Sequence, residues 1–290
     1  MPTPLTGLAP VAGRYRGYII DLWGVVHDGV HAYSGVVECL TRLRADGARI
    51  CLLSNVPRRA RLIEQVLARM GIPRSAYDHL VTSGETVVEA LRHPPDDWHR
   101  QLGRRYLHLG PNDDRDDFGA LEGLIEVGAP DQADFILLRD PDTFDSVLDD
   151  YRERLQTCAE RGLPMVCANP DHWAMVGGKR VMCAGLLAAH YQSLGGEVRY
   201  HGKPFASVYR RCLELIGTDD PTTVLAIGDS LHTDIAGANA AGLASVLVPS
   251  GVHGTELGCV WGELPDRVRL AQTIAATGHR PAAVLARLAW

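Results

Sequence analysis

Short apolar runs alternate with amphipathic stretches along the first part of the chain. Apolar and β-branched residues fill positions 18–20, 50–53 and 80–82, whereas apolar positions recur every three or four residues over 36–46 and 58–70. The short runs predict buried strands, and the longer stretches predict helices. Strands that alternate with helices in this way are typical of a parallel sheet, so we expect an α/β fold.

The middle of the chain continues this alternation with elements of its own. We expect strands at 106–109, 134–138 and 165–168 and helices at 144–161 and 183–194. A strand at 198–200 would return the chain to the first sheet, followed by helix 207–216, strand 223–227, helix 234–241 and strand 245–248. The pattern therefore predicts a core formed by residues 1–84 and 198–290, with residues 85–197 inserted as a second α/β domain.

Two further segments fall outside this alternation. The stretch 264–290 places apolar residues at helical spacing, and we expect it to pack on the core as helices, with Trp290 anchored. The same surface could instead form the contact of a homodimer. The acid-rich stretch 113–117 is expected to be a solvated loop.

Composition and charge narrow the class of protein. Of the 290 residues, 46% are apolar and 22% are charged, which is ordinary for a soluble globular protein. The net charge of -6 and the absence of a long basic block give no sign of nucleic-acid binding. No apolar run approaches the roughly 18 residues that span a membrane, and the N-terminus lacks a signal-peptide pattern. We therefore expect a cytoplasmic protein without a membrane contact.

The cysteines and histidines do not suggest a zinc site. The seven cysteines include no Cys-x-x-Cys pair, which favours buried thiols in a reducing compartment over redox or zinc chemistry. His27 and His31 lie four residues apart, but in a glycine-containing stretch and without a third ligand motif.

Polar residues suited to phosphate and metal chemistry follow four of the expected strands. They are Asp21, the pair Ser54 and Asn55, Lys203 in a Gly-Lys-Pro loop, and the pair Asp229 and Asp234. Ligands bind at the carboxyl ends of strands in open α/β sheets, and two acidic side chains at this spacing suit Mg2+. Taken singly, each has an ordinary explanation, such as a helix cap for Asp21 or for the Ser-Asn pair.

Together these segments resemble the haloacid dehalogenase (HAD) superfamily, in particular its class IIA, NagD-like capped hydrolases. The resemblance covers nearly the whole chain and includes Gly24, Gly29, Gly202-Lys203-Pro204, Gly228-Asp229 and Thr233-Asp234-Ile235. It implies a Rossmann-like parallel-sheet core with an inserted α/β cap of the C2 type. It also implies a phosphoric monoester hydrolase that uses Mg2+.

The resemblance assigns roles to individual residues. Asp21 would be the nucleophile that forms an aspartyl-phosphate, and Lys203 would stabilise charge. Ser54 and Asn55 would contact the phosphate. The metal would be held by Asp21, the Trp23 main-chain carbonyl and Asp229, and Asp234 would support either the metal or Lys203.

The inserted domain carries an Asn-Pro-Asp element that resembles one in the caps of this subclass. Asn169 and Asp171 are therefore candidate substrate-binding residues, and Arg180 on the following basic stretch is a weaker candidate. Caps of this kind cover the phosphate site and exclude water. An ordinary Asx-Pro turn explains the same residues without a function.

Trp23 departs from the family pattern, which has a second aspartate two residues after the nucleophile. That aspartate acts as general acid and base, whereas an indole has no titratable group. Its loss would cost about 10²- to 10⁴-fold in rate, or roughly 3 to 5 kcal/mol in barrier height. Three interpretations stay open: a substrate with a good leaving group, replacement of the acid by His27 or Asp28, or loss of turnover.

We therefore predict a Mg2+-dependent phosphohydrolase that attacks a small phosphorylated metabolite through Asp21, with weak or atypical acid–base support. The alternative is a catalytically impaired protein on the same scaffold that binds a phosphorylated ligand in a regulatory role.

Overall fold

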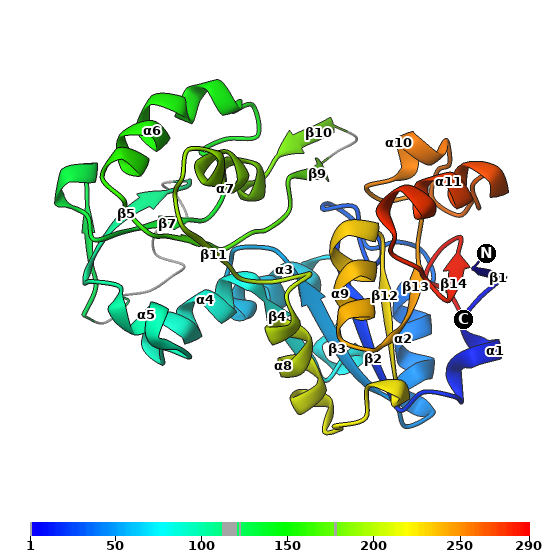
Figure 1. Cartoon of the computed structure of the whole chain (residues 1–290). Coiled ribbons are helices and arrows are strands. Elements are labelled where there is room, and N and C mark those ends of the chain that lie inside the picture. Colours follow the sequence, from blue (N-terminus) through cyan, green and yellow to red (C-terminus); the bar gives the residue numbers. More distant parts are fainter. Residues whose placement is uncertain (1, 112–120, 122, 177–178) are drawn as a thin grey trace.

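Two parallel sheets form the framework of the protein (Figure 1). The computed structural model describes residues 2–111, 121, 123–176 and 179–290, so the acid-rich stretch 113–117 lies outside the described residues. The larger sheet, called the core sheet, has the order β1-β14-β13-β12-β2-β3-β4. Its strands are β1 (Thr3–Leu5), β2 (Gly17–Asp21), β3 (Arg49–Ser54), β4 (His79–Thr82), β12 (Val224–Gly228), β13 (Ala244–Leu247) and β14 (Ala283–Leu285).

The smaller parallel sheet, called the cap sheet, has the order β11-β8-β7-β5-β6. Its strands are β5 (Arg105–Leu109), β6 (Ile125–Val127), β7 (Phe135–Leu138), β8 (Met165–Cys167) and β11 (Val198–Tyr200). Beside it lies an antiparallel hairpin of β9 (Trp173–Val176) and β10 (Lys179–Met182). The α/β fold with a Rossmann-like core and a cap is thus confirmed.

Helices cover both sheets. Those associated with the core sheet are α1 (Ala9–Ala12), α2 (Val36–Ala45), α3 (Ala60–Arg69), α8 (Ala206–Ile216), α9 (Ala236–Ala240), α10 (Gly254–Leu257) and α11 (Arg267–Thr277). The remaining α-helices are α4 (Ser83–Arg92), α5 (Asp97–Gln101), α6 (Arg152–Glu160) and α7 (Ala184–Ser193). Short 3-10 helices are η1 (Arg74–Ala76), η3 (Pro130–Gln132), η4 (Leu148–Tyr151) and η5 (Pro221–Thr223), and η6 (Leu231–Ile235) is a π-helix.

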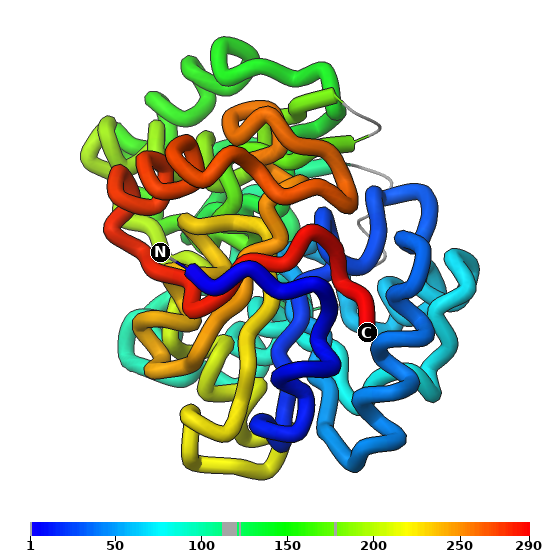
Figure 2. The backbone as a smooth tube through the Cα atoms, turned by 90° about the vertical axis from the view of Figure 1, so that its right-hand side faces the viewer, coloured from blue at the N-terminus to red at the C-terminus, as the bar shows by residue number. Residues whose placement is uncertain are grey.

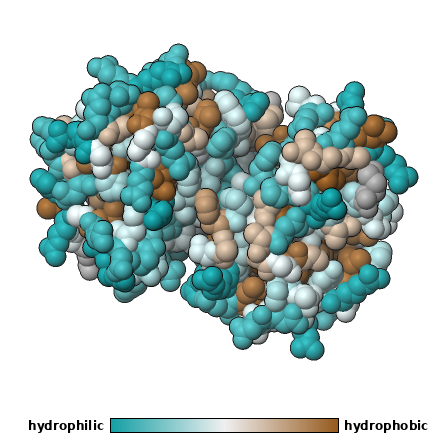
Figure 3. All heavy atoms as spheres, viewed as in Figure 1, coloured by the Kyte–Doolittle hydropathy of each residue, from teal (hydrophilic) through white to brown (hydrophobic). Residues whose placement is uncertain are grey.

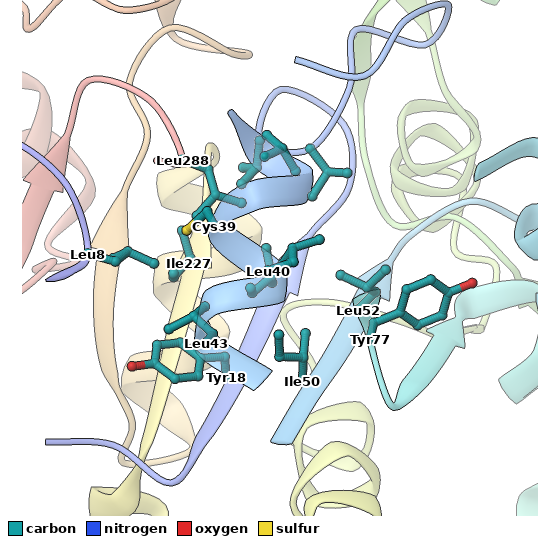
Figure 4. Close-up of a cluster of buried hydrophobic side chains, with 14 of the residues drawn as sticks. Leu8, Tyr18, Cys39, Leu40, Leu43, Ile50, Leu52, Tyr77, Ile227 and Leu288 are labelled. Carbon is teal, nitrogen blue, oxygen red and sulfur yellow. The ribbon is translucent and has the colours of Figure 1, made fainter. Parts of the chain in front are cut away.

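The central strands β2 and β12 of the core sheet are buried along their whole length because they consist almost entirely of apolar residues. In β2, Tyr18 and Ile20 point into one cluster, which includes Leu40 and Leu43 of α2, whereas Ile19 points into another, formed with α8. Neighbouring side chains of a strand lie on opposite faces, so a continuous apolar run fills two layers. Figure 4 shows the first of these clusters, and Figure 1 shows α2 and α8 on opposite sides of the sheet.

The predicted return of the chain to the core at residues 198–200 is wrong. β11 pairs in parallel with β8, with Val198 opposite Met165, and so forms the edge of the cap sheet. Its short apolar pattern fits either sheet, and only the pairing partner decides between them. Lys203 therefore follows a cap strand directly.

The long helix predicted at 144–161 is also shorter than expected. Helical structure begins with η4 at Leu148, and Phe144 and Val147 lie outside it and are exposed. A capping contact sets this later start, because the Asp150 carboxylate accepts a hydrogen bond from the Val147 N–H at 2.8 Å. Such local bonds compete with helix formation.

The C-terminal stretch is only partly helical. α11 agrees with the prediction, but Val284 and Leu285 lie in β14, which pairs with β1 and β13. An isolated apolar triplet does not distinguish a buried strand from a helix. Figure 2 shows the N-terminal and C-terminal segments side by side at this edge.

The polarity of the surface and the burial of the cysteines agree with what the composition predicts. Hydrophilic residues cover most of the face seen in Figure 3, with hydrophobic ones scattered among them. All seven cysteines are free and buried, as expected for thiols that pack in a core. Among the described residues, no helix is both long and apolar enough to cross a membrane.

Candidate active site

A buried lysine joins two aspartates at the carboxyl end of the core sheet. Asp21 is the last residue of β2, and the Lys203 Nζ donates to its Oδ1 at 2.5 Å. The same ammonium donates to the Asp234 Oδ1 at 2.7 Å. Each of the three residues is at most 5% exposed, so water screens the pairs very little.

Burial and charge act against each other in this cluster. Burial raises the pKa of Asp21 to about 7, although Lys203 opposes the rise and Asp234 adds to it. Burial alone would lower the pKa of Lys203, but the nearby charges of Asp21 and Asp234 outweigh it and raise that pKa well above its usual value. Lys203 is therefore a permanent cation at the strand ends.

Asp229 brings a third carboxylate to the same place. It follows β12, and oxygens of Asp21, Asp229 and Asp234 all lie within 4.8 Å of one another. Its Oδ2 accepts a hydrogen bond from the Val252 N–H at 2.7 Å. A Cβ on Gly251 would lie 1.8 Å from that oxygen, so the backbone approaches the carboxylate as closely as only glycine allows.

Asp234 already uses both of its carboxylate oxygens. Oδ1 accepts from Lys203, and Oδ2 accepts from the Ser230 N–H at 3.1 Å. Ser230 in turn caps η6, with its side chain accepting from the Thr233 N–H. The π-helix therefore holds Asp234 towards Lys203, and it begins before the helix predicted at 234–241.

Ser54 and Asn55 lie where β3 ends, and Asn55 connects three parts of the chain. Its Oδ1 accepts from the Lys203 N–H at 2.7 Å, and its Nδ2 donates to the Lys203 carbonyl and to the Asp171 Oδ1, both at 3.1 Å. Ser54 is 2% exposed, and its hydroxyl accepts from the Val56 N–H. One amide thus joins β3, the Gly-Lys-Pro loop and the cap.

The Asn-Pro-Asp element of the cap is held by its own hydrogen bonds. The Asn169 Oδ1 accepts from the Asp171 N–H at 3.0 Å, and its Nδ2 donates to the Asp140 Oδ1 at 2.9 Å. The Gly185 N–H at the start of α7 donates to the Asp171 carbonyl at 3.0 Å. Burial raises the pKa of Asp171 to about 6 and that of Asp140 to about 7.

Trp23 packs on its own loop. Its ring meets the His27 ring edge to face, with centroids 5.3 Å apart. Gly29, at φ +95°, lies against it so closely that a Cβ there would be 2.5 Å from the indole. Both features fix the indole within the loop that follows Asp21.

The two side chains predicted as substitutes for the missing acid are poorly suited to that role. Burial lowers the pKa of His27 to about 4, so the ring is neutral near pH 7. Burial would raise the pKa of Asp28, but hydrogen bonds from the backbone N–H groups of His31 and Val30 lower it overall. An acid of low pKa holds no proton to donate near neutral pH.

The predicted residues thus fall into two groups. Lys203 lies between Asp21 and Asp234 in one connected cluster with Asn55 and Asp171, whereas the Arg180 guanidinium lies over the Trp173 ring on the exposed hairpin. The sequence analysis missed Arg139 and Asp140. Both directly follow strand β7, so the carboxyl-end pattern used for Asp21 indicates them as well.

Arg139 connects the two sheets. It is 2% exposed, and its Nε and one terminal amino group donate to the Pro57 carbonyl at 3.3 and 3.1 Å. Pro57 lies shortly after β3, so the segments that follow a cap strand and a core strand meet through this contact.

Comparisons with known proteins identify the class of protein. A family model described as haloacid dehalogenase-like hydrolase matches residues 18–122, and one described as HAD-hydrolase-like matches residues 200–289. Chronophin of Homo sapiens is 30% identical over 265 residues, with 86% of each chain covered. Ribonucleotide monophosphatase NagD of Escherichia coli (strain K12) is 27% identical over 245 residues, covering 82% of this chain and 88% of that one.

A solved structure agrees with these matches. The crystal structure of a haloacid dehalogenase-like hydrolase from Brucella suis 1330 superposes with a TM-score of 0.82 and 31% identity. It covers 98% of this chain and 99% of that one. The chain therefore belongs to the haloacid dehalogenase-like hydrolases. Within them it is a class IIA capped enzyme, a phosphoric monoester hydrolase.

Proposed function

We propose that this phosphatase is Mg2+-dependent and acts on a small phosphorylated metabolite through an aspartyl-phosphate at Asp21. The observation that carries the proposal is the buried Asp21–Lys203 pair with Asp229 beside it. Lys203 holds Oδ1 of Asp21, and no described residue donates a hydrogen bond to Oδ2. That oxygen is therefore available as the nucleophile.

The donor set fits Mg2+. This ion prefers a near-octahedral shell of oxygens, with one or two carboxylates supplemented by water and phosphate. Asp21, Asp229 and the Trp23 main-chain carbonyl would hold it directly. Asp234, whose oxygens both accept hydrogen bonds, would orient Lys203 and complete the acidic cluster. When bound, the ion would neutralise charge on the phosphoryl group.

The proposed phosphate contacts lie around Lys203. The Ser54 hydroxyl, the Asn55 backbone and the Lys203 ammonium offer donors at adjoining strand ends. Asn169 and Asp171 would cover the site from the cap. The 3.1 Å hydrogen bond between Asn55 and Asp171 brings the cap close to this site, which favours a compact substrate.

The test is Mg2+-dependent release of phosphate from a panel of monoesters and acyl phosphates. We expect release by the wild type, and a loss of about 10³-fold or more in Asp21→Asn, which cannot form the phosphoenzyme. Asp28→Asn is the matched control, because it alters an exposed acid of the same loop. A hydroxylamine-labile adduct at Asp21 during turnover would identify the intermediate.

Trp23→Asp separates the enzyme from the regulatory alternative. Release by the wild type that requires Asp21 supports the enzyme. No release by the wild type on any substrate, together with clear release by Trp23→Asp, would show that the scaffold binds phosphate but has given up turnover.

A further inference from the structure

We infer that Asp171 of the cap is the general acid and base of this site, supplying the proton transfer that Trp23 cannot. This inference rests on the proposed phosphatase reaction at Asp21. Hydrogen bonds through Asn55 and Lys203 connect the Asp171 carboxyl group to Asp21.

The position of Asp171 is fixed from both sides. Its backbone N–H donates to Asn169, and its carbonyl accepts from Gly185 at the start of α7. Its Oδ1 accepts from the Asn55 amide, which also holds the Lys203 backbone, and Lys203 holds Asp21. Two residues therefore connect this carboxyl group to the nucleophile, and each connecting contact is 3.1 Å or shorter.

The second oxygen of Asp171 is uncommitted. In the described part of the chain, Oδ1 is the oxygen that accepts from Asn55, and no residue donates to Oδ2. Near pH 7 the His27 ring is neutral, and a neutral imidazole is too weak an acid to protonate a leaving group. Asp28 is fixed by backbone donors on an exposed turn. Asp140 of the cap contacts Asn169, whereas Asp171 contacts Asn55 at the end of the strand that also holds Ser54.

The electrostatic surroundings keep this carboxyl group titratable near neutral pH. Burial raises the pKa of Asp171 to about 6, against the opposing charge of Lys203, with a smaller rise from Asp234. The other titratable groups whose pKa values respond to its charge are Asp21, Asp140, Cys167 and Cys183. A group of this kind can both give and accept a proton during one cycle.

The proton balance closes over two steps. As Asp21 Oδ2 bonds to phosphorus, the bond from phosphorus to the leaving oxygen breaks, and protonated Asp171 gives that oxygen its proton. Asp171 carboxylate then takes a proton from the water whose oxygen attacks the aspartyl-phosphate. The bond from phosphorus to Asp21 breaks, inorganic phosphate leaves, and Asp171 is protonated again.

The test compares Asp171→Asn with the wild type on an alkyl phosphate and on p-nitrophenyl phosphate, whose leaving group needs little protonation. Asparagine keeps an oxygen for Asn55 but cannot exchange protons. We expect the first turnover of the alkyl phosphate to fall about 10²- to 10⁴-fold, and that of p-nitrophenyl phosphate to change far less. The phosphoenzyme at Asp21 should then accumulate, because the base for its hydrolysis is missing.

The pH dependence of kcat/KM distinguishes a general acid from a residue that only positions its neighbours. For the wild type, kcat/KM on the alkyl phosphate should fall as the pH rises above about 6, because the acid loses its proton. Asp171→Asn should lose this branch, Asp171→Glu should retain one, and Asp28→Asn should match the wild type. Trp23→Asp in the Asp171→Asn background should restore turnover of the alkyl phosphate.

Two results overturn the inference. One is an equal first-turnover loss on both substrates with the pH branch intact, which would make Asp171 a residue that only positions Asn55. The other is an Asp171→Asn variant as active as the wild type. Both results presuppose an active wild type that requires Asp21, so they are distinguishable from failure of the proposed reaction itself.

Discussion

The two parallel sheets present their carboxyl ends to the same site but contribute different charged groups to it. The core sheet supplies the acids Asp21 and Asp229 from β2 and β12. The cap sheet supplies the cation, because Lys203 follows β11, and it also supplies Arg139, which reaches the core at Pro57. The Asp21–Lys203 ion pair joins a residue of the core sheet to one that follows a cap strand, so it forms only when both sheets are in place.

The sheets also differ in how they hold their acids. At the core sheet, Asp21 is held by a full positive charge, whereas at the cap sheet Asp140 is held by the neutral amide of Asn169. A neutral donor stabilises a carboxylate less than an ammonium does. Lys203 therefore opposes the rise that burial causes in the pKa of Asp21, whereas the side-chain donor to Asp140 is uncharged.

Lys203→Met should produce the largest effect on this balance. It leaves two buried carboxylates without a cation, so we expect a loss of about 3 to 5 kcal/mol in the free energy of unfolding, measured with urea. Without Lys203 the pKa of Asp21 rises further above its unfolded value. The folded variant then binds more protons than the unfolded chain, and its stability falls as the pH rises. An equal loss at pH 5 and pH 8 would contradict this account.

Gly251→Ala should have the next largest effect, because it disturbs the core acids alone. The added methyl would meet Asp229 Oδ2 at 1.8 Å, and we expect a loss of about 1 to 3 kcal/mol in stability and weaker Mg2+ binding by calorimetry. Gly13→Ala is the control, since a Cβ there meets nothing within 4 Å and φ is -69°. Similar losses in the two variants would show that the close approach at Asp229 is unimportant.

Asp140→Asn tests how the stability of the fold depends on pH through a cap acid. Burial raises the pKa of Asp140 to about 7, so the wild-type fold loses stability as the pH rises from about 4 to about 7. The variant lacks this titration and keeps an oxygen for the Asn169 amide. We expect it to gain roughly 2 to 3 kcal/mol relative to the wild type between pH 5 and pH 8, measured by thermal unfolding at each pH. Parallel pH profiles would contradict the prediction.

Lys179→Met should produce the smallest effect. Lys179 also pairs with an aspartate, Asp145, but their side chains are 62% and 84% exposed. Solvent screens such a pair, and we expect a change in stability of less than about 0.5 kcal/mol. A large loss of stability in Lys179→Met would show that burial is not the reason why the Lys203 ion pairs stabilise the fold more than the Lys179 pair does.

Much of the core was predictable because its strands are continuous apolar runs that end in polar residues. Asp21, Ser54 and Asp229 were found in this way, and their strands form neighbouring parts of one sheet. The same rule applies to Asp140, which was overlooked because no motif accompanied it.

The remainder depended on contacts between distant parts of the chain. The sheet to which β11 belongs is set by its partner β8, and β14 is a strand only because β1 and β13 lie beside it. The three residues of either strand contain neither fact. The hydrogen bond between Asn55 and Asp171 spans 116 positions, so the sequence named both residues without showing that they meet.

The separation between Asp21 and Lys203 also has a consequence for biosynthesis. During translation, Asp21 emerges from the ribosome early. Lys203, which carries the opposite charge, emerges 182 residues later, after the entire cap. Until then the nascent chain can bury β2 only with an unpaired carboxylate, or protonated, and β12 does not yet exist to pair with it. The core sheet can therefore close only after the inserted segment has been made, which delays its folding towards the end of translation.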